Sequence, residues 1–288
     1  MIHTLENQEL TVSVTDHGAE LCSIYDKKND REVIWQADPA FWKRHAPVLF
    51  PNVGRHYGDR YRLGGKEYPS SQHGFARDSE FTCIGETEDS LTHTLLSSDE
   101  TKKNYPSDFE LQITHSLTDR TLTVKWKVKN TGSEVMYFTI GGHPAFALPD
   151  ADGKEFHLSF EGKSELSYCL IDTATGTAIP DVVYSLPLTE GSCPVGPHMF
   201  DKDALIFDGQ IERAAILLPD KTPYVELCSP GFSSFGIWSV PGAPFICLEP
   251  WMGRCDNCGF AGDLSEKPGI ISLEPGEIFE KDYQIRIY

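Results

Sequence analysis

Three segments in which apolar and polar residues alternate constrain the fold of this chain more than any other feature. They span residues 91–96, 109–115 and 122–128. Successive side chains of a strand point to opposite faces of a sheet, so each segment has one apolar and one polar face. Strands of this kind are typical of antiparallel sheets that are covered on one side.

Shorter segments of the same type occupy most of the remaining chain. We expect further strands at 9–14, 21–25, 33–35, 136–140, 156–160, 178–184, 214–218, 225–228, 235–240, 269–273 and 283–287. The 24 glycines and 19 prolines supply turns between them. No long amphipathic helix and no low-complexity linker interrupts this pattern. The sequence therefore predicts an all-β protein of antiparallel sheets, with 1–288 forming a single domain.

The net charge narrows the range of partners. The chain carries 25 basic and 43 acidic residues, a formal charge of -18. This field repels phosphate backbones and anionic lipid, so we expect neither nucleic acid nor membrane as a partner. A neutral small molecule fits the charge, and isolated arginines can still hold an anion.

The N-terminal residues and the cysteines indicate a reducing compartment. Residues 1–7 lack the basic head and apolar stretch of a signal peptide, and no segment is long enough to span a membrane. The 8 cysteines are scattered, with several in apolar runs, so they do not form a disulfide framework. Cys255 and Cys258 form an isolated C-x-x-C, which we interpret as two thiols in a turn. We expect a cytoplasmic protein.

The apolar run Phe245–Leu248 predicts a buried strand, and the carboxylate of Glu249 follows directly at its end. Pro244 and Pro250 flank the run, and a proline in this position predicts that the strand stops there. A carboxyl group beside apolar neighbours tends to have a raised pKa, which suits a general base near neutral pH. A glutamate that points from the strand end into water is the alternative.

Other candidate site residues lie in loops and at strand ends. Arg55 and His73 belong to a polar, loop-rich stretch between 46 and 78, the kind of segment that carries binding sites on a rigid scaffold. His143 follows a glycine pair and precedes Pro144, where an imidazole can act as an acid or a base. Asp203, just before an apolar run, can accept hydrogen bonds from ligand hydroxyls. Structural roles in loops and turns are the alternatives for all four.

Four motifs together resemble the aldose 1-epimerase, or galactose mutarotase-like, family, and most closely its short bacterial branch associated with lactose operons. The motifs are Leu49–Arg55, Gln72–Arg77, Gly142–Phe146 and Cys247–Trp251, which occur in the order and with the spacing of that family. The resemblance extends over nearly the whole chain. It implies a large antiparallel β-sandwich, the galactose mutarotase-like supersandwich, with a sugar cleft on one sheet.

The resemblance also implies roles for the candidate residues. Glu249 takes the position of the general base and His143 that of the general acid. Arg55 and His73 match positions that bind sugar hydroxyls, and Asp203 is a weaker match to the hydroxyl-binding aspartate. Aromatic Phe146 stands one position further from His143 than in many mutarotases, a difference that bears on sugar choice. The expected partner is an aldohexose, and the expected assembly is a monomer or a homodimer.

The chemistry of anomer exchange requires few groups. One group removes the O1 proton, another protonates the ring oxygen, and the opened sugar recloses on its other face. One carboxylate and one imidazole suffice, so we expect neither a metal nor an organic cofactor. Two alternatives remain: a hexose-6-phosphate mutarotase, suggested by Arg60, Arg62 and Arg77, and a sugar-binding protein without turnover.

Overall fold

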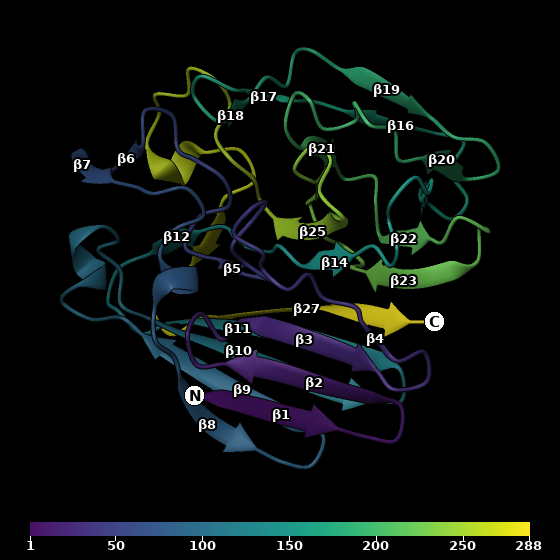
Figure 1. Cartoon of the computed structure of the whole chain (residues 1–288). Coiled ribbons are helices and arrows are strands. Elements are labelled where there is room, and N and C mark those ends of the chain that lie inside the picture. Colours follow the sequence, from purple (N-terminus) through teal and green to yellow (C-terminus); the bar gives the residue numbers. More distant parts are fainter.

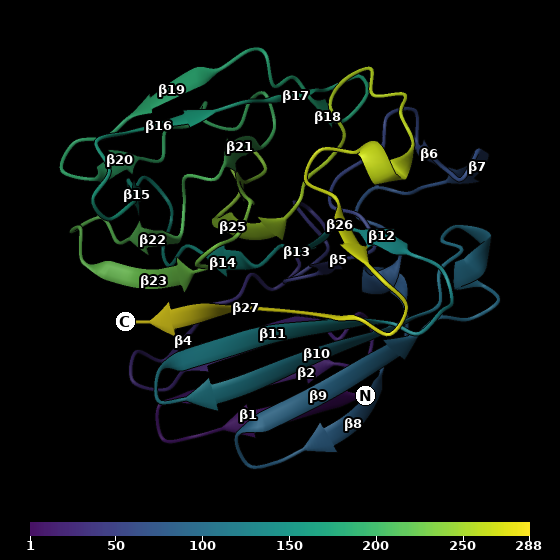
Figure 2. The same cartoon turned by 180° about the vertical axis from the view of Figure 1, so that it is seen from behind.

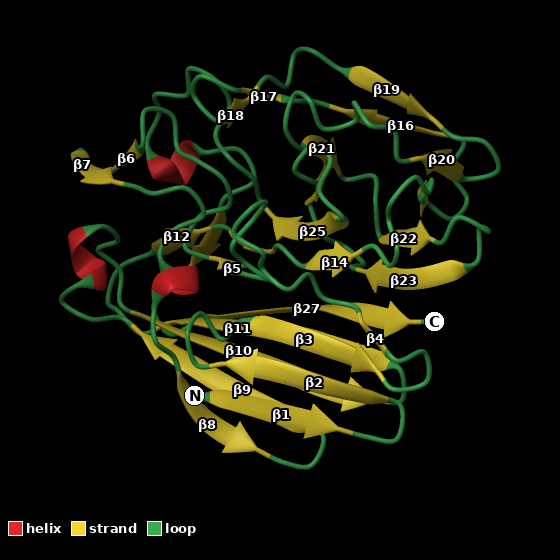
Figure 3. Cartoon of the chain, in the orientation of Figure 1, coloured by secondary structure: helices red, strands yellow, loops and turns green.

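The computed structural model describes residues 1–288, and its regular elements are almost entirely strands (Figure 3). The helical elements are three short 3-10 turns, η1 (Ala76–Asp78), η2 (Thr101–Lys103) and η3 (Leu264–Glu266). None of the helices has the length and apolar character needed to cross a bilayer. The prediction of an antiparallel all-β fold is confirmed.

The largest sheet has nine strands, and each pair of adjacent strands in it is antiparallel. In spatial order they are β20 (Ser192–Pro194), β15 (His157–Ser159), β22 (Arg213–Leu217), β23 (Pro223–Cys228), β27 (Ile278–Ile287), β11 (Thr121–Asn130), β10 (Phe109–Thr118), β9 (Ser90–Leu96) and β8 (Thr82–Glu86). The three alternating segments are β9, β10 and β11, which lie side by side with their apolar residues buried, except for the exposed Leu96 at the end of β9.

A four-stranded sheet covers one end of the nine-stranded sheet. It consists of β1 (Ile2–Glu6), β2 (Leu10–Thr15), β3 (Leu21–Asp26) and β4 (Arg31–Glu32), and it lies against β8–β11 (Figures 1 and 2). Every second residue of β2 is buried between the layers. Each large apolar side chain buried in this way contributes about 1.5–3 kcal/mol to folding.

The prediction of a strand at 33–35 is wrong. β4 ends at Glu32, and Ile34 makes only an isolated bridge to Phe146.

A six-stranded sheet forms the scaffold of the candidate site. Its members are β21 (Leu205–Asp208), β24 (Ser234–Trp238), β25 (Phe245–Met252), β13 (Ile140–Gly142), β5 (Val48–Leu49) and β14 (Ala145–Ala147). β25 is central, since it pairs with β24 on one side and with β13 and β14 on the other. Seven of its eight residues are buried, which explains the continuous apolar run.

The expectation that β25 ends before Pro250 is wrong. The strand continues to Met252, and Glu249 lies inside it, opposite Gly236 of β24. The N–H of Leu248 donates to the Pro144 carbonyl, and residues two apart in a strand point their N–H groups to the same side. Pro250 therefore faces the gap between β13 and β14, where its missing N–H costs no ladder hydrogen bond.

The remaining strands form two-stranded hairpins and one long-range pair at the periphery. They are β6 (Arg60–Leu63) with β7 (Lys66–Pro69), β16 (Glu165–Tyr168) with β19 (Tyr184–Pro187), β17 (Ile171–Asp172) with β18 (Thr177–Ala178), and β12 (Met136–Phe138) with β26 (Ile271–Leu273). The single strand expected at 178–184 is wrong. Its two ends belong to different hairpins, and Val182 and Val183 between them are exposed.

Trp251 of β25 packs against two glycines of its neighbours. A Cβ atom at Gly236 would lie 2.4 Å from the Trp251 ring, and one at Gly141 would lie 2.5 Å from it. Real Cβ atoms do not approach other atoms so closely, so glycine at these positions allows the indole to lie flat across the sheet.

We expect Gly236→Ala to lower the free energy of unfolding by about 1–3 kcal/mol, since the added methyl overpacks the indole. Urea unfolding measures this change. Gly196→Ala is the matched control, because a Cβ atom there has no neighbour within 4 Å; it should stay within about 0.5 kcal/mol of the unsubstituted protein. Equal effects of the two substitutions would contradict the tight packing at Trp251.

Candidate active site

A cavity of about 300 Å³ opens on the six-stranded sheet and collects four of the five candidate residues. Glu249, His143, His73 and Asp203 all line it, although they come from distant parts of the sequence. Three tryptophans, Trp42, Trp238 and Trp251, also line it. Arg55 does not line this cavity.

Glu249 is a carboxyl group in an almost completely buried position. Its residue is 1% exposed, and its Oε2 atom has no hydrogen-bond partner. Burial raises the pKa of Glu249 well above its ordinary value of 4.5, and the charge of nearby Asp203 raises it further. The alternative of a glutamate that points into water does not apply.

His143 is placed by the backbone and by aromatic rings. It follows β13 directly, and its N–H donates to the carbonyl of Pro47. Its ring stacks on Trp42 with centroids 4.8 Å apart and meets the ring of Trp238 edge-on at 5.6 Å. Burial lowers the pKa of His143 to about 3, and the positive charge of Arg77 contributes.

Glu249 and His143 form a pair. The distance from Glu249 Oε2 to His143 Nε2 is 3.2 Å. Burial favours the neutral form of each group, so the pair retains one proton over a wide pH range. The contact does not have hydrogen-bond geometry, but the carboxyl oxygen and the imidazole nitrogen are near enough to exchange a proton.

His73 lines the cavity, and its Nε2 atom lies 3.4 Å from the side-chain amide nitrogen of Gln72. Its Nδ1 accepts a hydrogen bond of 3.0 Å from the N–H of Gly54, so in the neutral ring the proton is on Nε2. Burial lowers the pKa of His73 well below 6.5, and the neighbouring His143 contributes. The ring centroids of these two histidines are 5.6 Å apart.

Asp203 is held in an unusual backbone conformation. Its φ is +76°, and its Oδ1 accepts a hydrogen bond of 2.7 Å from the N–H of Ala204. A left-handed φ at a residue other than glycine is uncommon and requires support from the surrounding structure. This conformation places Asp203 at the cavity, where its charge affects Glu249.

Arg55 lies at the margin of the cavity, behind Gly176. A Cβ atom at Gly176 would be 2.5 Å from Arg55 Cδ, and Gly176 itself lines the cavity. The guanidinium bonds Asp59 Oδ1 at 2.7 Å and reaches Gln72 Oε1 at 3.5 Å. Its carboxylate partner is exposed, so the side chain can exchange this contact for another at small cost.

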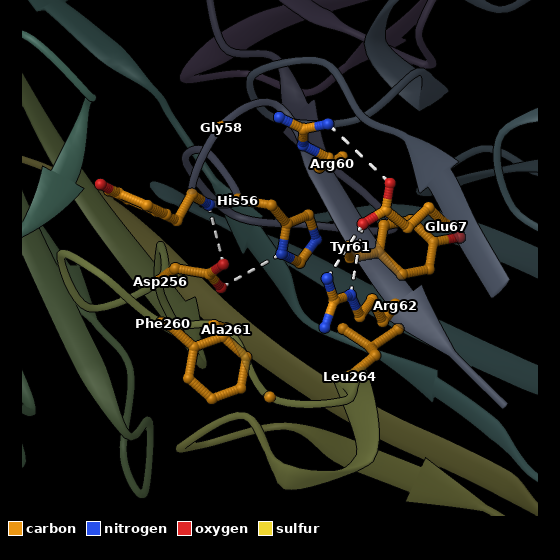
Figure 4. A pocket seen from close by; sticks show the side chains of 12 residues that line it. His56, Gly58, Arg60, Tyr61, Arg62, Glu67, Asp256, Phe260, Ala261 and Leu264 are labelled. Carbon is orange, nitrogen blue, oxygen red and sulfur yellow. Dashed lines mark hydrogen bonds and ion pairs between the residues drawn. The ribbon is translucent and has the colours of Figure 1, made fainter. Parts of the chain in front are cut away.

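The loop that carries Arg55 is anchored by a buried ionic cluster beside a second pocket (Figure 4). Asp256 accepts hydrogen bonds from His56 Nδ1 at 3.1 Å, from the Tyr57 N–H at 2.9 Å and from Lys267 Nζ at 2.6 Å. Although burial opposes ionisation, these contacts lower the pKa of Asp256 to about 2. The cluster therefore joins the Arg55 loop to the segment after β25.

Arg60 and Arg62, which suggested a phosphate group, point into this second pocket. Both form ion pairs with Glu67 (Figure 4). Arg77, by contrast, lines the cavity with Glu249, and its buried Nε atom has no hydrogen-bond partner. Burial and the neighbouring Arg44 lower the pKa of Arg77 to about 10, so it remains positively charged.

Sequence reasoning did not assign site roles to the three tryptophans. Trp251 was visible as an aromatic two residues after Glu249, but nothing in the sequence connects Trp42 with position 143. In the structure the indole of Trp42 covers one face of the His143 ring. Flat apolar surfaces with a few polar groups between them are typical of small-molecule sites.

Two of these cavity residues lie beside a buried cysteine, Cys247, so that three side chains of metal-binding types come together. Atoms of His143, Cys247 and Glu249 lie within 4.8 Å of one another. Burial raises the pKa of the Cys247 thiol well above 9.0, and the charge of Glu249 adds to the effect. A protonated thiol is a poor metal ligand, so this trio suits proton transfer better than metal binding.

Comparison with known proteins gives a consistent result. The sequence model of the family described as aldose 1-epimerase matches residues 1–286. The chain is 31% identical to the plasmid-encoded protein LacX of Lactococcus lactis subsp. lactis over 294 residues, covering 98% of each chain. The chromosomal LacX of the same organism matches with the same identity and coverage.

Two solved structures have nearly the same fold. A galactose mutarotase related enzyme from Lactobacillus acidophilus is 33% identical, with a TM-score of 0.94 over 100% of this chain and 97% of the other. A galactose mutarotase-like protein from Lactobacillus casei is 32% identical, with a TM-score of 0.93 over 100% of both chains. The supersandwich implied by the resemblance is confirmed.

Proposed function

The chain belongs to the aldose 1-epimerase family, in the short branch that includes the LacX proteins, and we propose that it interconverts the α and β anomers of a free aldohexose. The observation that carries this proposal is the distance of 3.2 Å between Glu249 Oε2 and His143 Nε2 in the wall of a buried cavity. The hydroxyl oxygen O1 and the ring oxygen of a pyranose are bonded to the same carbon. The base and the acid must therefore each be within hydrogen-bond reach of two neighbouring oxygens, and a close pair of groups in one cavity wall meets this requirement.

In the proposed reaction Glu249 accepts the proton of the O1 hydroxyl while His143 donates its proton to the ring oxygen. The bond between C1 and the ring oxygen breaks, and its electron pair becomes the O–H bond of the opened sugar. Rotation about C1–C2 presents the other face of the aldehyde. The two groups then return their protons in reverse, so the enzyme is unchanged. Each positioned proton-transfer group typically contributes about 10²–10⁴ to the rate.

The shared proton has to be on His143 when the reaction begins. In the free cavity burial favours the neutral pair, but an O1 hydroxyl that donates to Glu249 stabilises the carboxylate. His73 Nε2 and Asp203 provide a donor and an acceptor for the other hydroxyls, and the tryptophans cover the apolar faces of the sugar.

Replacing the proposed base tests this function. Glu249→Gln keeps the shape of the side chain but cannot accept the O1 proton, so we expect kcat to fall by about 10² or more while KM changes much less. Polarimetry on freshly dissolved α-glucose and α-galactose measures the rate. His143→Asn should lose rate as well, through failed protonation of the ring oxygen.

Glu226→Gln is the matched control, because this half-buried glutamate of β23 lies outside the cavity and should retain full activity. A near-normal kcat of the Glu249 variant would refute the assignment of the base. If the unsubstituted protein accelerates no common aldose but calorimetry shows sugar binding, a non-catalytic sugar-binding protein is the better description.

The pH dependence tests the shared proton. Below the lowered pKa of His143, about 3, the pair carries two protons and lacks a base. Above the raised pKa of Glu249 the pair has lost its last proton and lacks an acid. We therefore expect kcat/KM, corrected for buffer catalysis, to fall at the alkaline side with an apparent pKa well above 4.5. A profile that rises near 4.5 and then stays level would contradict the paired arrangement.

A hexose 6-phosphate is the second candidate substrate, and the positive side chain of Arg77 at the cavity favours it, although its Nε atom also forms an ion pair with Asp78 at 3.7 Å. Glu249 and Asp203 in the same cavity and the net charge of -18 disfavour an anion. Arg60 and Arg62 are paired with Glu67 elsewhere.

We expect kcat/KM to be higher for glucose than for glucose 6-phosphate, measured by polarimetry at equal concentrations and ionic strength. A preference for the phosphorylated sugar that is lost in Arg77→Met would reverse this order and identify Arg77 as the phosphate ligand.

A further inference from the structure

A second cluster of metal-ligating side chains lies away from the sugar cavity, at the edge where the two sheets of the sandwich meet. One ligand atom each of His3, Cys83 and His93 lies within 4.8 Å of the others. His3 is on β1, an edge strand of the four-stranded sheet, and Cys83 is on β8, an edge strand of the nine-stranded sheet. These strands lie below β27 in Figure 1, whereas β25 lies above it.

The strand pairing brings the three residues together. Cys83 is directly opposite His93 in the register of β8 and β9, and a bulge between Cys83 and Gly85 changes the course of the edge strand at this point. His93 points inward between the sheets and is 0% exposed. Bulges often redirect a side chain at a sheet edge.

Asp16 adds a fourth donor. Its Oδ1 lies 2.9 Å from His3 Nε2 and 3.4 Å from His93 Nε2, while its Oδ2 pairs with the Met1 ammonium at 2.7 Å. Separations of this size are close to those between neighbouring ligands around one small ion. His3 Nδ1, on the other side of its ring, lies 3.3 Å from Glu86 Oε2. A carboxylate behind an imidazole is the usual outer partner of a metal-binding histidine.

The side chain of His93 has no adequate partner within the protein. Both of its ring nitrogens are buried and without a hydrogen bond, and Asp16 Oδ1 is near Nε2 but makes no hydrogen bond to it. Buried polar atoms are rarely left in this state, because the lost hydration is not replaced.

We propose that His3, Cys83, His93 and Asp16 bind a divalent transition-metal ion of the zinc type. Zn²⁺ accepts imidazole, thiolate and carboxylate ligands and prefers four of them, whereas Mg²⁺ and Ca²⁺ require oxygen ligands. Binding releases the thiol proton of Cys83, and the ligand atoms need to contract around bonds of about 2.0–2.3 Å. The ion joins the edge strands of the two sheets and so stabilises the sandwich.

The experiment uses the full chain without a tag at either terminus, because Met1 contacts Asp16 and a histidine tag would itself bind metal. After dialysis against a chelator, Zn²⁺ is titrated by calorimetry and the melting temperature is followed. Co²⁺ serves as a spectroscopic probe, since a thiolate ligand produces a charge-transfer band. We expect one equivalent of metal, a higher melting temperature with Zn²⁺, and a thiolate-to-cobalt band.

Cys83→Ser should abolish the band and weaken Zn²⁺ binding by at least about tenfold, the low end of the cost of losing even an outer partner. Cys228→Ser is the matched control, a cysteine of similar exposure on β23, and should retain both signals. His3→Asn provides a second variant at a partly exposed position and should also weaken binding. Anomerisation should be unchanged in all three variants, because none of these residues lines the sugar cavity.

The proposal is overturned if Zn²⁺ does not raise the melting temperature, if the cobalt spectrum contains no thiolate band, or if Cys83→Ser and Cys228→Ser bind metal equally well. Each of these outcomes is independent of whether the protein acts on sugars. A failure here would leave Glu249 and His143 unaffected.

Discussion

The burial of one carboxyl group in the middle of a central strand is the constraint on which the site depends. Glu249 is enclosed by β24 on one side and by the ends of β13 and β14 on the other. An isolated charge in such a position costs several kcal/mol, so the group requires either a proton or a partner. His143 offers both, because its Nε2 atom is within hydrogen-bonding distance of the carboxyl oxygen.

The interruption between β13 and β14 makes this pairing possible. If β13 and β14 formed one continuous strand, residue 143 would be paired with β25 like any other strand residue. A carbonyl of that strand would then face Pro250, which has no N–H to donate to it. Instead the chain breaks at His143–Pro144, which accommodates Pro250 and directs the imidazole toward Glu249. One irregularity of the backbone therefore accommodates the proline and places an imidazole beside the buried carboxyl group.

Local patterns in the sequence predicted the fold well and the site in part. The alternation in β9–β11 and the apolar run of β25 identify strands because burial acts on each strand separately. The predicted end of β25 was wrong because a proline can stand at position 250 only where it faces a gap in the neighbouring strand. That gap, between β13 and β14, lies more than a hundred residues earlier in the sequence. Family motifs singled out Glu249, His143 and His73, and Asp203 was a weaker match outside these motifs; the structure places all four around one cavity. Arg55 at its margin and Trp42 over the imidazole depend on loop packing that no local pattern encodes.

The histidines of this protein follow one physical rule with different results. A buried neutral imidazole has one donor and one acceptor nitrogen, and each requires a partner. His73 satisfies its acceptor with a backbone N–H, which leaves its donor for a ligand. His143 brings its Nε2 atom to 3.2 Å from a carboxyl oxygen, the arrangement from which we propose proton exchange. His93 has neither arrangement, although a carboxylate, a second imidazole and a thiol surround it. The partner that each ring lacks thus indicates the chemistry that its surroundings support, and for His93 that chemistry is metal coordination.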